Sequence, residues 1–162
     1  MKLYFDTNII IDILKSREPF FENSNKIFML AAEEKIEGIV GTSTITDIYY
    51  LIRKQYADTE TAVKFIFDIL EIIKPVDTLV NDIFSAAELN FSDFEDAVVA
   101  AIAQREETDY IITRNTKDYS KSPVPAIVPE EFLALWGGSY RGILGNWIFI
   151  QFSREVRVHP LR

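Results

Sequence analysis

The stretch that decides the fold is SDFEDAVVAAIAQREETDYIITRNTKDY, residues 92–119. Small and apolar residues recur at helical spacing over 93–107, so we predict a helix there with Ser92 as its N-cap. YIIT, residues 110–113, is a short apolar run and predicts a buried strand. A helix followed at once by a buried strand is typical of a βαβ unit in a parallel sheet. The helix is expected to bury Phe94, Ala97, Val98, Ala101 and Ile102.

The same alternation of strands and helices extends to both sides of this stretch. The predicted fold is α/β, a three-layer α/β/α arrangement with a small, mostly parallel sheet. Pro75 cannot donate a ladder hydrogen bond, so its strand is expected at a sheet edge. Sites in such sheets form at the carboxyl ends of the strands, where Asp6 and the residues after Thr113 fall. Strands are predicted at 2–6, 38–42 and 72–76, and helices at 8–14, 23–35, 43–55, 58–71, 78–89 and from 129 onward.

The composition excludes several kinds of site. The 162 residues contain no cysteine, which excludes disulfides and thiolate metal sites. The one histidine, His159, lies close to the end of the sequence, so a histidine zinc site or a Ser-His-Asp triad is not expected. No apolar run reaches the roughly 18 residues of a membrane span, and the N-terminal segment lacks a signal-peptide pattern, so we expect a cytoplasmic protein. The net charge of −8 argues against nucleic-acid binding, unless acids hold metal ions that reverse the local charge.

Asp6 ends the first predicted strand and directly precedes a helix. An aspartate at such a place commonly caps the helix that follows, which is the simpler interpretation. The pair Asp6 and Asn8 also places two oxygen ligands close together, which suits a hard cation. Both interpretations are compatible with the sequence at this point.

Two further aspartates lie near predicted helix starts. Asp47 flanks the stripe of Ile45, Ile48, Tyr49 and Ile52 that its helix is expected to bury. Asp96 lies early in the helix of residues 93–107, beside small residues that allow a ligand to approach. Acids at a helix start also stabilise the helix dipole, and this explains Asp93 better than Asp96.

Taken together, these motifs resemble a known family. FDTN at 5–8, a TxxD-type helix start at 44–47, DFEDAxxAAxA at 93–103 and IITRNTKDY at 111–119 occur in this order. The sequence resembles the PIN-domain family, the nucleases that include the VapC-type toxins of toxin–antitoxin pairs. The resemblance runs from about residue 2 to residue 135. It divides the chain into a nuclease domain, residues 1–136, and a tail of unassigned role, residues 137–162.

The tail differs from the rest of the chain in composition. It holds four of the six glycines, four arginines and one glutamate. Three interpretations of this tail stay open: an additional strand, an oligomer contact, or sequence foreign to the native gene.

The resemblance implies metal-dependent cleavage of RNA with Mg²⁺ or Mn²⁺. By position, Asp6, Asp47 and Asp96 correspond to the first three family acids and are expected to be catalytic and to bind metal. The family's second acid is more often glutamate, so Asp47 departs slightly. The place of the fourth acid holds Asn115, and Asp118 is the nearest carboxylate, which leaves one or two metal ions open.

The resemblance also assigns supporting roles and partners. Asn8, Asp93, Thr113 and Asn115 would support the ligands, since family members use a hydroxyl where Thr113 stands. Arg114, between the last strand and Asn115, is the preferred contact for RNA phosphates. An antitoxin protein and a second copy of the chain are the expected protein partners.

Two other classes compete with this interpretation. A haloacid-dehalogenase-type phosphatase also begins with a strand ending in aspartate, but that chemistry needs a second aspartate where this chain has Asn8. A non-catalytic relative that binds RNA or a partner stays open because of Asn115. The oxygen-rich ligand set fits hydrolysis assisted by two hard cations about 3.5–4 Å apart.

Overall fold

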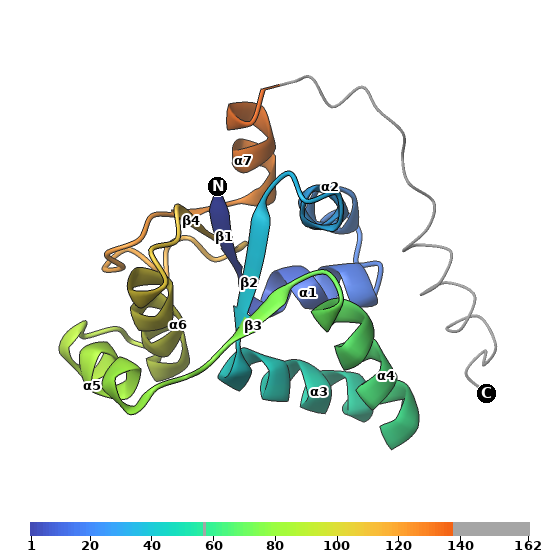
Figure 1. Ribbon diagram of the computed structural model, residues 1–162, viewed down its shortest axis with the longest axis horizontal. Helices are drawn as coiled ribbons and strands as arrows, with labels where there is room; N and C mark the ends of the chain where they lie inside the picture. Colours follow the sequence, from blue (N-terminus) through green and yellow to red (C-terminus); the bar gives the residue numbers. More distant parts are fainter. Residues whose placement is uncertain (57, 138–162) are drawn as a thin grey trace.

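The computed structural model describes residues 1–56 and 58–137. Within them, a sheet lies between two layers of helices (Figure 1). None of the helices in this described part is long and apolar enough to span a membrane. In chain order, the elements are β1 (Lys2–Phe5), α1 (Thr7–Leu14), α2 (Phe21–Ala32), β2 (Glu37–Gly41), α3 (Thr42–Tyr56), α4 (Thr59–Leu70), β3 (Lys74–Val76), α5 (Val80–Glu88), α6 (Phe94–Arg105), β4 (Tyr110–Ile112), β5 (Ala126–Ile127) and α7 (Pro129–Leu135).

The sheet has the order β3-β2-β1-β4-β5, and all of its pairs are parallel. The three-layer α/β/α prediction is therefore confirmed. β3, which contains Pro75, lies at an edge, as predicted. β1 lies at the centre, with Tyr4 opposite Ile39 on one side and Ile111 on the other. Because the strands are parallel, the residues that follow β1, β2 and β4 meet at one edge of the sheet.

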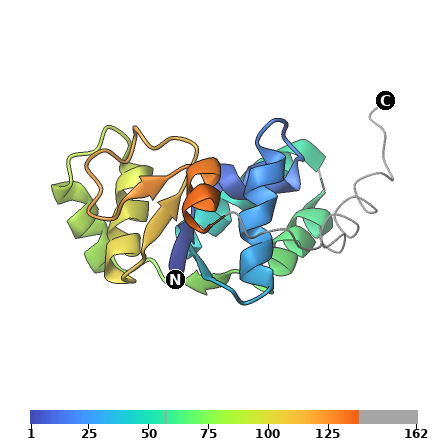
Figure 2. The same ribbon diagram turned by 90° about the horizontal axis from the view of Figure 1, so that it is seen from above.

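Both faces of the central strands are buried, which explains their uninterrupted apolar runs. Leu3 and Phe5 of β1 pack on the side covered by α1, α2, α3 and α4. Tyr4, between them in sequence, packs on the other side, against α6. Figure 2 shows the two helical layers from above, with α5 and α6 on one side of the sheet and α2 and α4 on the other.

The α6 helix departs from the predicted pattern. All residues from Ala97 to Ala103 are buried, because the helix packs between the sheet and α5. Phe94 was expected in the core but is 53% exposed at the start of the helix. The N-cap is Asp93, whose side chain accepts a hydrogen bond from the Glu95 amide, and Ser92 is not the cap.

Two other differences concern element boundaries. α3 was predicted over residues 43–55 but runs from Thr42 to Tyr56, so Asp47 lies in its second turn. β5 was not predicted, because two residues between prolines carry no periodicity. The predicted tail, residues 137–162, lies outside the described residues apart from Gly137.

Candidate active site

Asp6 occupies the N-cap position of α1, but its side chain makes no capping hydrogen bond. Its Oδ2 instead accepts hydrogen bonds from the Thr113 hydroxyl and the Asn8 amide, each at 2.6 Å. Asn8 also donates to Thr113 Oγ1 at 3.0 Å. The carboxylate is thus held across β1 and β4 by neutral donors, and the capping interpretation does not account for its orientation.

The segment after β4 is tied to the same network through its backbone. The Asn115 amide donates to Thr113 Oγ1 at 3.0 Å, and the Arg114 amide donates to Asn8 Oδ1 at 3.2 Å. Thr113 is fully buried, whereas the side chain of Asn115 is exposed. Four of the residues singled out in the sequence therefore belong to one hydrogen-bond network: Asp6, Asn8, Thr113 and Asn115.

Asp96 lies in the first turn of α6 and is half-buried. Its Oδ1 accepts a hydrogen bond from the Tyr119 hydroxyl at 3.2 Å. Asp6 and Asp96 influence each other electrostatically. Burial raises the pKa of Asp6 to about 6, with a further contribution from the Asp96 charge. Burial also raises the pKa of Asp96, and the charges of Asp93 and Asp118 add to this.

Glu95 connects these acids to Asp47. Its pKa is raised to about 7, first by burial and then by the charges of Asp47, Asp93, Asp6 and Asp96. The sequence analysis did not single out Glu95 as a site residue. Its position beside Asp96 at the helix start was the available signal, but that position did not distinguish it from an ordinary acid near a helix N-terminus.

These residues form what we call the acidic edge, at the carboxyl ends of the strands. Within residues 1–56 and 58–137, none of its members forms an ion pair with lysine or arginine. Carboxylates that repel one another without an internal cation are suited to bind an external one. The acidic edge comprises Asp6, Asp47, Asp93, Glu95, Asp96 and Asp118.

The donor set of the acidic edge fits Mg²⁺ or Mn²⁺, because it consists of oxygen ligands only. In the described part of the chain, however, no three of these acids are close enough to form a ready-made cage for one ion. Asp6 and Asp96 are the two best-held carboxylates, through Thr113 and Tyr119 respectively. The acidic edge therefore suits Mg²⁺ or Mn²⁺ by the type of its ligands and by its negative charge, and not by a preformed ligand geometry.

Arg114 is engaged inside the protein. Its Nε lies 2.8 Å from Oδ2 of Asp12, and its guanidinium lies 4.4 Å above the ring of Phe20. Asp12 is fully buried and also lies 3.7 Å from Arg17 Nε. The Asp12–Arg114 contact has the distance of an ion pair without the alignment of a hydrogen bond. Asp12 was not recognised as important in the sequence, because its partner is far away along the chain.

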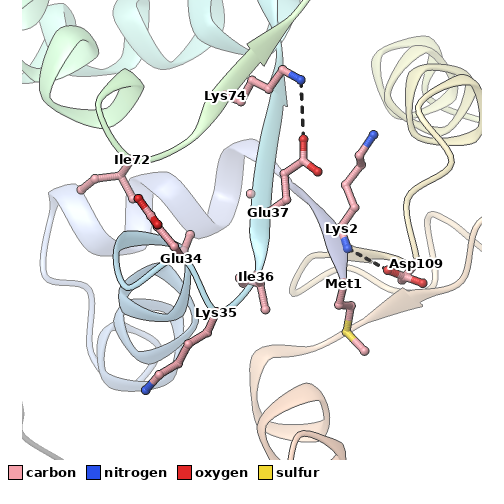
Figure 3. Close-up of a pocket in the computed structure, with 11 residues that line it drawn as sticks. Met1, Lys2, Glu34, Lys35, Ile36, Glu37, Ile72, Lys74 and Asp109 are labelled. Atoms are coloured by element: carbon pink, nitrogen blue, oxygen red, sulfur yellow. Dashed lines mark hydrogen bonds and ion pairs between the residues drawn. The ribbon is translucent and has the colours of Figure 1, made fainter.

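A hollow lies at the opposite end of the strands, between the starts of β1 and β2 and the end of α2 (Figure 3). Several of its charged side chains are paired with one another or with neighbours. Lys74 lies 3.6 Å from Glu37, and Lys2 Nζ lies 3.6 Å from Glu106. The backbone amide of Lys2 donates to Asp109 at 2.7 Å. We call this region the amino edge; it contains none of the predicted site residues.

Comparison with known proteins shows which family this chain resembles in sequence and fold. A PIN-domain family model matches residues 2–117. Ribonuclease VapC1 of Aquifex aeolicus is 25% identical over 140 residues, which cover 83% of this chain and 95% of that protein. Two solved structures share the fold. The first, VapBC2 from Rickettsia felis bound to a promoter DNA fragment, has a TM-score of 0.62 and 17% identity, with 79% and 98% of the two chains covered.

The second structure is Mycobacterium tuberculosis VapC20, described as a toxin that cleaves the sarcin-ricin loop. Its TM-score is 0.55 and its identity 12%, with 67% of this chain and 86% of that chain covered. The family model spans well over half of the chain, and its matched residues include Asp6, Asp47, Asp96 and Thr113. This chain belongs to the PIN-domain family.

Proposed function

We propose that the chain is an endoribonuclease that hydrolyses phosphodiester bonds of RNA with Mg²⁺ or Mn²⁺ bound at the acidic edge. The observation that carries this proposal is a set of mutually repelling carboxylates with no internal cation partner among the described residues. Metal-bound carboxylates also remove the objection raised by the net charge of −8, because the bound cations reverse the local charge.

Asp6, Asp47 and Asp96 are proposed as the catalytic metal ligands, with Asp118 as an additional one. When bound, Mg²⁺ or Mn²⁺ supplies a hydroxide nucleophile and neutralises charge at the leaving oxygen. Thr113 and Asn8 orient Asp6 by donating to one of its oxygens. Both of these hydrogen bonds are made to the same oxygen, Oδ2.

Substrate contact by Arg114 stays a prediction. The guanidinium carries five N–H donors, so a phosphate can bind while the contact with Asp12 is kept. The side chain is 21% exposed, which allows limited access from solvent. Asp93 has a structural role as the N-cap of α6, and it also contributes charge to the acidic edge.

The direct test is incubation of purified protein with mixed RNA in Mg²⁺ or Mn²⁺. We expect cleavage that EDTA abolishes and that added metal restores. Cleavage unaffected by EDTA would contradict metal dependence. No cleavage by folded, metal-loaded protein would favour the alternative, a PIN-domain protein that binds RNA or a partner without cutting. The same assay on a chain truncated after Trp136 tests whether residues 1–136 are sufficient.

We further propose that the chain is the toxin of a toxin–antitoxin pair in the cytoplasm and binds an antitoxin protein and a second copy of itself. The names of its relatives support this, as do two exposed apolar groups on the surface. One is on α5, where Val80 is 72% and Phe84 67% exposed; the other is on α3 and α4, where Tyr50 is 66% and Phe67 64% exposed. Such groups commonly mark protein interfaces. Expression of the chain alone is expected to slow cell growth, and the Asp96→Asn variant is expected to relieve this effect.

A further inference from the structure

Tyr119 belongs to the segment that follows β4 and contains no helix or strand. Turn hydrogen bonds shape this segment: the Asp118 amide donates to the Asn115 carbonyl at 3.0 Å, and the Tyr119 amide donates to the Thr116 carbonyl at 3.2 Å. Asn115 and Asp118 are exposed, but Tyr119 is only 3% exposed. Tyr119 therefore fixes the part of this segment that carries Asn115 and Asp118 in the protein core.

The ring and the hydroxyl of Tyr119 make different contacts. The ring packs edge-on against Phe91 at a centroid distance of 6.1 Å, within the core on the α6 side of the sheet. The hydroxyl donates to Oδ1 of Asp96 at 3.2 Å. A phenylalanine would preserve the ring packing completely, so packing alone does not explain the hydroxyl. Within the described part of the chain, the hydroxyl finds its hydrogen-bond partner in a carboxylate of the acidic edge.

The hydrogen bond restricts how the Asp96 carboxylate can turn. A carboxylate has about four lone-pair positions, and the Tyr119 hydroxyl occupies one of them on Oδ1. Oδ2 is left for another ligand. Hydrogen bonds of this kind orient metal-binding carboxylates and raise metal affinity. The interaction parallels that of Thr113 with Asp6, in which a hydroxyl also holds one carboxylate oxygen.

We propose that Tyr119 is a positioning residue that orients the Asp96 carboxylate for metal binding and fastens the segment containing Asn115 and Asp118 to α6. This inference rests on the proposed metal-dependent function of the acidic edge. It adds a residue that neither the motif comparison nor the count of carboxylates identifies. Tyr119 contacts neither metal nor RNA in this role; it acts through Asp96.

The test is Tyr119→Phe, with Tyr56→Phe as a matched control. Tyr56 lies at the end of α3, with its ring against Phe65 and its hydroxyl accepting a hydrogen bond from Gln55. Each variant loses one phenolic hydroxyl and keeps its ring. Mn²⁺ affinity of the metal-free proteins is measured by calorimetry, Tm by thermal unfolding, and RNA cleavage as a function of Mn²⁺ concentration.

For Tyr119→Phe we expect Mn²⁺ affinity to fall by about 10-fold or more, the range found when an outer partner of a metal ligand is removed. Cleavage should fall at low Mn²⁺ and largely recover at saturating Mn²⁺, with KM for RNA unchanged. Tyr56→Phe should match the wild type in both measurements. A purely structural role would instead lower Tm and reduce cleavage at every Mn²⁺ concentration.

Equal Mn²⁺ affinity of Tyr119→Phe and the wild type would overturn the inference, while wild-type cleavage in Mn²⁺ would leave the proposed function intact. A loss of cleavage that saturating Mn²⁺ does not restore, together with a lowered Tm, would also overturn it. If the wild type binds Mn²⁺ but cuts no RNA, weaker Mn²⁺ binding by Tyr119→Phe still supports the positioning role and the proposed function fails. If the wild type binds no Mn²⁺, both proposals fail.

Discussion

The two ends of the sheet differ in whether their charged side chains are paired with charges of opposite sign. At the amino edge, acids and lysines neutralise one another, as in the pairs Lys74–Glu37 and Lys2–Glu106. At the acidic edge, carboxylates face each other, and the pKa values of Asp6 and Glu95 are raised to about 6 and about 7. Acidic side chains are thus neutralised by lysines at one end of the sheet, and they have no basic partner among the described residues at the other end. Uncompensated charge costs stability, so its presence indicates a binding role.

Asp12 shows that burial alone does not create an uncompensated acid. Among the residues that the structure describes, none is more deeply buried than Asp12, yet Arg114 lies 2.8 Å away and Arg17 3.7 Å away. Burial raises its pKa, and both arginines oppose that effect. A buried aspartate with an arginine partner is a structural element, whereas Asp6, with only neutral donors, is a candidate ligand.

The largest expected effect is on catalysis. Asp96→Asn should reduce RNA cleavage by at least about 100-fold, since even the outer partners of metal ligands contribute 10–100-fold. The free energy of unfolding of the metal-free protein should be unchanged or higher, because one of several repelling charges is removed. Cleavage and urea unfolding of the same preparation test both parts. Wild-type cleavage by a cleanly purified variant would remove Asp96 from the catalytic set.

Breaking the ion pair between Asp12 and Arg114 should lower the stability of the folded protein. Asp12→Ala leaves Arg114 without its buried partner, and we expect the free energy of unfolding to fall by about 3 kcal/mol. Lys74→Ala at the amino edge is the control, because both partners are exposed and the expected change is below about 1 kcal/mol. Urea unfolding measures both variants. Similar values for the two would show that the Asp12–Arg114 pair is no more than a surface contact.

The metal-free protein should become less stable as the pH rises toward 7. Carboxyl groups of the unfolded chain titrate near pH 4. Asp6 and Glu95 hold their protons in the folded state up to about pH 6 and about pH 7. The folded state therefore binds more protons between these limits, and its free energy of unfolding should fall as pH rises from about 4 to about 7.

This pH dependence can be measured by urea unfolding in EDTA. Asp6→Asn should flatten the profile, since one of the shifted groups is removed. Added Mn²⁺ should restore stability near pH 7 and have little effect near pH 5, because the ion binds the deprotonated carboxylates. Stability that rises steadily from pH 4 to pH 7 in EDTA would show that the acidic edge is compensated after all.

The smallest effects are expected where the family's fourth acid is replaced. Asn115→Asp adds a carboxylate to the acidic edge and should tighten a second metal ion and raise cleavage at low Mg²⁺. Asp118→Ala should lower cleavage less than Asp96→Asn does, because Asp118 is exposed and acts on Asp96 through its charge. Metal titration of both variants distinguishes the roles. No change in Asp118→Ala and two equally tight ions in the wild type would assign Asp118 to the ordinary surface.

The sequence predicted where Asp6 and Thr113 lie in the fold, although their roles in the site stay predictions. Each follows an apolar run, and parallel strands bring the ends of such runs together. The pairing of Arg114 with Asp12 could not be predicted, since local periodicity contains no information about a partner 102 positions away. The prediction that Phe94 is buried was wrong for a related reason. Nearly every side of α6 is buried, so helical periodicity does not identify its exposed end.

The central position of β1 also means that its surroundings are completed only by residues far along the chain. Of the described strands, β1 is synthesised first, yet its second neighbour, β4, ends at Ile112. The Asp6 amide bonds to the carbonyl of Ile112 at 3.1 Å, and the Asp6 carboxylate bonds to Thr113. A nascent chain that has not yet exposed these residues has an incomplete sheet and an unsupported carboxylate. Such long-range pairing also makes folding slow compared with helical proteins of this size. The order of the strands therefore leaves Asp6 without its Thr113 partner until 107 further residues have been made.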